Sequence, residues 1–109
     1  MIKVRYEKKE EICLLSVTGH AGAAPRGADL ICAAVTALCY TLAQALTLEL
    51  REKARVSLRE GAAEITAPAE GAAEHTFWVV RTGLRMLAYN YPEHITMEEK
   101  TNERNSENQ

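Results

Sequence analysis

The spacing of apolar residues along the chain is the feature that most constrains the fold. Alternating or nearly continuous apolar runs are typical of strands, and apolar residues every three or four positions are typical of helices. The chain changes between the two patterns several times. We expect strands at Met1–Glu7, Ile12–Thr18, Ala54–Glu60, Ala63–Ala67 (stopped by Pro68) and Glu93–Met97, and helices at Leu30–Arg51 and Ala69–Tyr89. This order (ββαββαβ) predicts one compact α+β domain, with two helices covering a mainly antiparallel sheet of about five strands.

The alternation also predicts the core. The inward-facing residues are expected to be Cys13, Leu15 and Val17 in the second strand, Ala54, Val56 and Leu58 in the third, Ala63, Ile65 and Ala67 in the fourth, and Ala73, Phe77, Val80, Leu84 and Leu87 in the second helix. The second strand is apolar on both faces, so it is expected to be central in its sheet or buried on both sides. The second helix also carries Trp78 and Val79, part of which is expected to be a subunit contact or further core.

The chain has 109 residues, which favours a single domain, at residues 1–97. The remaining segment, 98–109, is polar and lacks aromatic and aliphatic residues. Such a segment cannot bury enough apolar surface to pack, so we predict a disordered tail.

Composition excludes several classes of function. The formal net charge of −2 leaves no overall electrostatic attraction for nucleic acid or an anionic membrane, so neither is expected as a direct partner. Polar residues interrupt the long helix and charged residues interrupt the N-terminal strand, which argues against a membrane span and a signal peptide. Three cysteines without a CxxC pair fit a reducing compartment, so we expect a cytoplasmic protein. No Cys/His spacing matches a metal site, and no cofactor is expected.

The stretch 19–38 holds the candidate chemistry. His20 ends the second strand, Asp29 is the expected N-cap of the long helix, and Cys32 is expected in the helix's opening turn. Unpaired amides and the helix dipole at such a position can lower a cysteine pKa from about 8.5 to roughly 3.5–7.5. An adjacent imidazole could then hold or take the proton of the thiol. Backbone amides near 31–33 would be placed to hold an oxyanion.

Helical phase separates the cysteines of this helix. Cys32 leads the most polar side of the helix, which continues through Thr36, Tyr40, Gln44, Thr47 and Arg51. Cys39 belongs to the opposite, buried side. We therefore expect Cys32 to be accessible, and Cys13 and Cys39 to be core residues.

A loop of small residues joins His20 to the helix. It holds few apolar contacts, so we expect it to open and close easily and to gate the site. The loop residues are Ala21, Gly22, Ala23, Ala24, Pro25, Arg26, Gly27 and Ala28.

The motif His20-Ala21, Gly27-x-Asp29 and Cys32-Ala33-Ala34-Val35-Thr36-x-Leu38 resembles the bacterial ribosomal-processing cysteine protease family, Prp. Gly83-Leu84 and Tyr91-Pro92 extend the resemblance. It implies a homodimeric α+β endopeptidase with Cys32 as nucleophile and His20 as base. The implied substrate is the N-terminal extension of large-subunit ribosomal protein twenty-seven. Thr36 stands where the family usually has serine, which keeps a hydroxyl there.

Each functional interpretation has a structural alternative. Cys32 could be a small buried residue, His20 a strand-end histidine bonded to backbone, and Asp29 a helix cap rather than a residue that orients His20. Thr36 could donate to substrate or be solvated. His75 and His94 are expected at the surface. The alternative function is a non-enzymatic peptide-binding or ribosome-assembly factor that uses the same cleft.

Overall fold

The computed structural model describes residues 1–20 and 26–101, with the side chains of 26–29 left out. Its elements are β1 (Ile2–Lys9), β2 (Ile12–Thr18), α1 (Arg26–Leu50), the short 3-10 helix η1 (Arg51–Lys53), β3 (Arg55–Arg59), β4 (Ala62–Pro68), α2 (Ala73–Asn90) and β5 (Ile95–Thr101). The predicted fold class and element order are confirmed.

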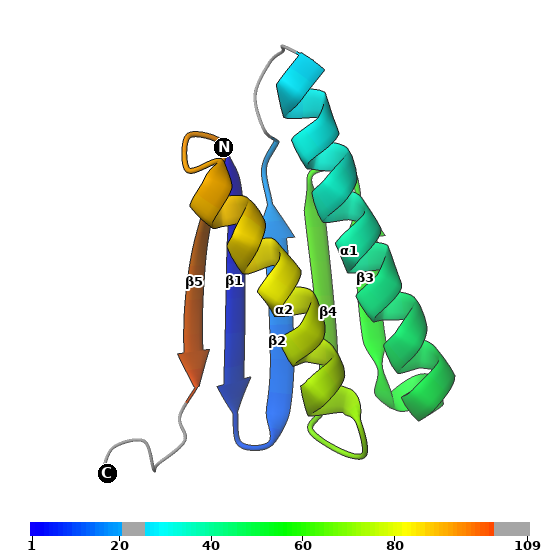
Figure 1. Ribbon diagram of the computed structural model, residues 1–109. Coiled ribbons are helices and arrows are strands. Elements are labelled where there is room, and N and C mark those ends of the chain that lie inside the picture. Colours follow the sequence, from blue (N-terminus) through cyan, green and yellow to red (C-terminus); the bar gives the residue numbers. More distant parts are fainter. Residues whose placement is uncertain (21–25, 102–109) are drawn as a thin grey trace, which may run out of the picture.

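The five strands form one sheet in the order β3-β4-β2-β1-β5. Neighbouring strands are antiparallel except for β1 and β5, which are parallel. Figure 1 shows both helices on the same side of this sheet. The sheet therefore has one covered face and one open face, and β2 lies at its centre, as its apolar sequence predicted.

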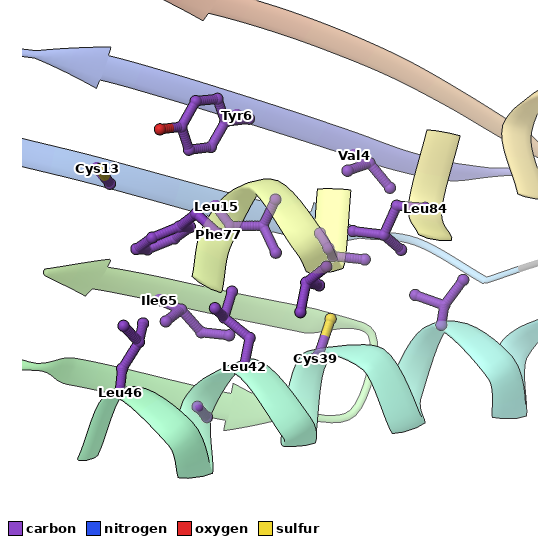
Figure 2. Close-up of a cluster of buried hydrophobic side chains, with 14 of the residues drawn as sticks. Val4, Tyr6, Cys13, Leu15, Cys39, Leu42, Leu46, Ile65, Phe77 and Leu84 are labelled. Carbon is purple, nitrogen blue, oxygen red and sulfur yellow. The ribbon is translucent and has the colours of Figure 1, made fainter. Parts of the chain in front are cut away.

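The core lies between the helices and the covered face. Figure 2 shows Tyr6, Leu15 and Ile65 of the sheet meeting Leu42 of α1 and Phe77 of α2. The buried apolar residues are those expected for β2, β4 and α2, although Ala63 and Leu87 are only half-buried. Val56 is an exception: it faces the helices but is exposed, because β3 is an edge strand.

The helices approach each other closely at Gly83. A Cβ atom at this position would lie 3.2 Å from Leu38 Cδ1, so a larger residue would require the Leu38 side chain to shift. At the start of α2, the Glu49 carboxylate accepts a hydrogen bond from the Ala72 amide at 3.3 Å. The two helices therefore meet near Leu38 and near Glu49 of α1.

Three predicted boundaries differ from the structure by four residues. The first helix begins at Arg26 rather than Leu30, and the last strand ends at Thr101 rather than Met97. Residues 98–101 therefore belong to the sheet and not to a tail, whereas 102–109 lie outside the described residues. The second helix begins at Ala73, four residues later than expected, after the positive φ of Gly71.

The stretch Leu30–Lys53, most of it in α1, is long and apolar enough to cross a membrane by length and composition alone. The core helix of a soluble protein meets the same test. Val35, Cys39, Leu42 and Leu46 of α1 are buried in the core, which accounts for much of its apolar character.

Candidate active site

A cleft of about 420 Å³ lies between the N-terminal half of α1 and one end of the sheet. Cys32, Thr36 and Tyr40 line it from α1, and His20 lines it from the segment after β2. The turn between β3 and β4, at Glu60 and Gly61, completes the rim. The cleft thus brings together the two residues that the sequence singled out as nucleophile and base.

Gly61 lies against His20 in this cleft, although the sequence identified it only as a turn residue. The Gly19 amide donates a hydrogen bond of 3.0 Å to the Gly61 carbonyl, which ties the end of β2 to the β3–β4 turn. Gly61 has a φ of +77°, and a Cβ there would lie 2.9 Å from His20 Nε2. The positive φ therefore favours glycine at position 61, and the missing side chain leaves room for the His20 imidazole.

Cys32 lies at the expected place in the cleft but not at the expected place in the helix. Its side chain is half-buried, and it is the seventh residue of α1 rather than part of the opening turn. The amides without an intrahelical partner are those of the first four residues, 26–29. Residues 31–33 lie beyond that turn, so the predicted oxyanion site at their amides is wrong.

Asp29 is likewise not the N-cap, because it lies inside the first turn of α1. Pro25 directly precedes Arg26 in the sequence, and a proline next to a helix start is the signal that could have placed this boundary. A role for Asp29 in orienting His20 stays a prediction. In the expected gating loop, Ala21–Pro25 lie outside the described residues, and Arg26, Gly27 and Ala28 belong to α1.

The polar side of α1 is confirmed as its exposed side. Thr36, Tyr40, Gln44 and Thr47 are all exposed. The Thr41 hydroxyl donates to the Ala37 carbonyl at 2.8 Å, the usual contact for a helical threonine. Thr36 makes no such bond within the described part of the chain, so its hydroxyl is available to a group in the cleft.

The other two cysteines are core residues, as predicted. Burial raises the pKa of the Cys39 thiol to about 11, and burial is also the main cause of the raised pKa of Cys13. Both thiols are therefore protonated near neutral pH. Although Cys39 contributes to the wall of the cleft, its environment disfavours the thiolate that a nucleophile requires.

The remaining histidines lie outside the cleft. His75 is exposed on α2 and stacks on Trp78 with a centroid separation of 5.5 Å, while His94 is half-buried before β5. Within residues 1–20 and 26–101, no three His, Cys, Asp or Glu side chains are grouped as metal ligands.

A sequence model of a family described as cysteine protease Prp matches residues 1–96. No curated protein matches the chain significantly. Among solved structures, SMU.848 from Streptococcus mutans is 27% identical, with a TM-score of 0.73 over 93% of this chain and 95% of that one. The ribosomal processing protease Prp of S. aureus, in complex with a substrate peptide, is 20% identical, with a TM-score of 0.78 over 92% of this chain and all of that one. A second structure of that protease holds a covalently linked product peptide (20% identity; TM-score 0.75; 92% and 100% coverage).

Proposed function

The chain belongs to the Prp family of cysteine proteases, and from this premise we propose that Cys32 is its nucleophile and His20 its general base. The observation that carries the proposal is that these two residues, from separate elements, line one cleft. The other two thiols are buried, so Cys32 is also the cysteine with access to a substrate.

The chemistry divides between the two side chains. His20 takes the thiol proton of Cys32, and the resulting thiolate forms a bond to the scissile carbonyl carbon. When the C–N bond breaks, His20 returns the proton to the leaving amine. A water molecule, deprotonated by the same imidazole, then releases the acyl group from the sulfur. General acid–base catalysis of this kind increases the reaction rate about 10²–10⁴-fold.

The negative charge on the carbonyl oxygen needs a hydrogen-bond donor during the attack. The helix amides near Cys32 are already paired within α1, so they cannot supply it. Thr36 lies one turn after Cys32 on the same exposed side and lines the same cleft. We assign its hydroxyl as a donor to substrate, a role that serine could also fill.

The proposed substrate is the N-terminal extension of large-subunit ribosomal protein twenty-seven. The S. aureus protease of the same fold has been crystallised with substrate and product peptides, which supports a peptide as the ligand. The cleft lies beside α1 between Cys32 and Tyr40, next to the proposed nucleophile. A newly made ribosomal protein as substrate also supports the cytoplasm as the compartment.

We further propose that the protein acts as a homodimer. Trp78, Val79, Met86 and Tyr89 leave an apolar stripe exposed along α2, on the side away from the core. The stripe lies apart from the cleft, so dimerisation through it leaves the cleft open.

The test is cleavage of a peptide that spans the precursor's processing site, followed by mass spectrometry. We expect cleavage by the native protein and loss of at least about 10³-fold in kcat for Cys32→Ala and for His20→Gln. Thr36→Val should lower kcat by roughly 10-fold or more, and Thr36→Ser should restore it.

Cys39→Ala is the matched control, because it removes the other thiol of α1 and should keep kcat within about threefold of the native value. Full activity of Cys32→Ala in a correctly folded protein would refute the assignment. An uncleaved peptide that binds equally well to native and Cys32→Ala protein would favour the non-enzymatic peptide-binding function.

A further inference from the structure

The open face of the sheet is a polar surface that the proposed protease chemistry does not use. Both helices lie on the other side (Figure 1), and exposed and buried residues alternate along β1. None of the strand residues that point to the open face is buried. This face is therefore available to solvent over most of the sheet.

Positive charge is concentrated on this face. The strand register places six cationic side chains there: Lys3, Arg5, Lys9, Arg55, Arg59 and Lys100. The acidic side chains on the same face are three: Glu7, Glu64 and Glu98. The face is thus cationic, although the whole chain has a net charge of −2.

Internal pairing neutralises only part of this charge. Arg5 lies 3.7 Å from Glu7, and Lys100 lies 3.8 Å from Glu98. Lys3, Lys9, Arg55 and Arg59 make no ion pair with any residue in the described ranges. Four cations on this face are therefore free to meet an external anion.

The free cations are spread across the sheet. β3, which carries Arg55 and Arg59, is separated by β4 and β2 from β1, which carries Lys3 and Lys9. Three strand spacings correspond to about 14 Å, and six residues along β1 correspond to about 20 Å. The arrangement suits an extended array of negative charges better than a single small anion.

We propose that the open sheet face binds the phosphate backbone of RNA. The positive charges on the face complement a polyanion. The strand residues on this face include no aromatic side chain that could stack on a base, so we expect contacts to phosphates and no preference for a particular RNA sequence. The large apolar side chains on this face are the exposed Ile12 and the half-buried Leu14 of β2, fewer than a surface that inserts into lipid presents. The choice of RNA rests on the proposed ribosomal-protein substrate, which is assembled with RNA.

This proposal revises the expectation, drawn from net charge, that nucleic acid is not a partner. The net charge averages over the molecule, whereas binding depends on the charge of one surface. Acidic residues such as Glu52, Glu70, Glu74 and Glu93 lie off the strands, so they lower the net charge without neutralising this face.

The test is the binding of a short RNA hairpin to the full chain, measured by fluorescence anisotropy at several salt concentrations. We compare the native protein with the double variant Lys9→Glu/Arg55→Glu. Both residues lie away from the cleft, so peptide cleavage without RNA should be unchanged. We expect the affinity for RNA to fall at least about 10-fold near 0.1 M salt, and the slope of log affinity against log salt to decrease by about 2.

The matched control is Arg51→Glu/Lys53→Glu, which makes the same change in net charge in η1, outside the strands. The control should keep most of the affinity. Equal losses in the two double variants, no binding of RNA by the native protein, or stronger binding of anionic vesicles than of RNA would each overturn the proposal. Because cleavage is measured without RNA, failure of the protease assignment would appear separately.

Discussion

Cys32 and Cys39 lie on one helix, seven residues apart, and their environments differ. Cys32 is half-buried at the cleft, while Cys39 is buried, with its pKa raised by desolvation. Seven residues make about two helical turns, so both cysteines lie on nearly the same side of α1 and both line the cleft. Helical phase therefore does not explain the difference, which comes from how deeply each turn of α1 packs on the core.

Gly61 provides a test of how His20 is positioned. In Gly61→Ala, the new Cβ would lie 2.9 Å from His20 Nε2, and the positive φ would add strain of about 1–2 kcal/mol. We expect a loss of stability of that order and a fall in kcat of at least about 10-fold, since a displaced base acts less efficiently. Peptide cleavage and urea unfolding measure the two effects.

Gly71→Ala is the control, because Gly71 also has a positive φ but faces Glu49 rather than His20. It should lose similar stability and keep its kcat. If both variants lose activity in proportion to stability, Gly61 has only a structural role.

The contact between Gly61 and His20 could not be predicted from the sequence. It joins positions about forty residues apart through the β2–β4 pairing, and the turn pattern at Glu60-Gly61 does not indicate which side chain packs on the turn.

The start of the first helix was predicted wrongly for a different reason. Asp29 is a good N-cap residue by type, but the helix continues through it to Arg26.

At the scale of the elements, β5 extends further than its apolar residues predicted. Ile95 and Met97 face the helices, and by alternation Glu99 does too. The side chain of Glu99 accepts hydrogen bonds from Arg85 and Arg81, the shortest at 2.7 Å. In a sequence, a carboxylate at an inward-facing position normally indicates that the strand has ended. Here Arg81 and Arg85 of α2 pair with the carboxylate, so the strand continues past it.

Arg81 connects this cluster to the core. Its guanidinium lies 3.9 Å from the centroid of the buried Tyr6 ring, and Tyr6 in turn packs against Phe77. Burial raises the pKa of Tyr6 well above its usual range, so the ring stays neutral beneath the cation. β5 is thus joined to α2 by charged groups in addition to its pairing with β1.

Glu99→Gln should therefore weaken the β5–α2 contact. Hydrogen bonds from Arg85, and then from Arg81, hold the pKa of the Glu99 carboxyl below its ordinary 4.5. A lowered pKa in the folded state contributes stability above pH 4.5 that is lost as the pH falls through the folded-state pKa. We expect a loss of about 1 kcal/mol in the free energy of unfolding at neutral pH, and a smaller difference in acid, by urea unfolding.

Glu98→Gln is the control for this prediction. Glu98 is adjacent in sequence but lies on the open face, 3.8 Å from the exposed Lys100. Its replacement should change stability little at any pH. A difference for Glu99→Gln that stays constant into acid would show that charge pairing is not the cause.

At the scale of the whole molecule, the fold presents three different surfaces, of which the cleft and the cationic face meet at Arg59. The cleft lies at one end of the sheet, the cationic face lies opposite the helices, and the apolar stripe lies on the outside of α2. The sequence predicted the layers, because patterns of local spacing determine which residues are inward. It did not predict the strand order, which depends on pairings between distant segments such as β1 and β5.

The stripe on α2 is the predicted dimer contact. Trp78 is 49% exposed and Tyr89 is 84% exposed, and the four stripe residues, at positions 78, 79, 86 and 89, lie on one side of α2. In a two-fold dimer, the same patch of each subunit forms the interface, so a single substitution changes both halves of the contact. Trp78→Glu would place a charge near its own symmetry mate in a desolvated contact, and the dissociation constant should rise about 30-fold or more.

Sedimentation velocity over a range of protein concentrations measures this effect. Leu48→Glu is the matched control, because Leu48 is 68% exposed at the far end of α1 and lies outside the stripe. The native protein and Leu48→Glu should sediment as dimers at concentrations where Trp78→Glu is monomeric. A monomeric native protein would refute dimerisation itself, whereas a dimeric Trp78→Glu variant would move the contact to another surface. Since the stripe and the cleft are separate, monomeric Trp78→Glu should still cleave the peptide, which distinguishes loss of assembly from damage to the site.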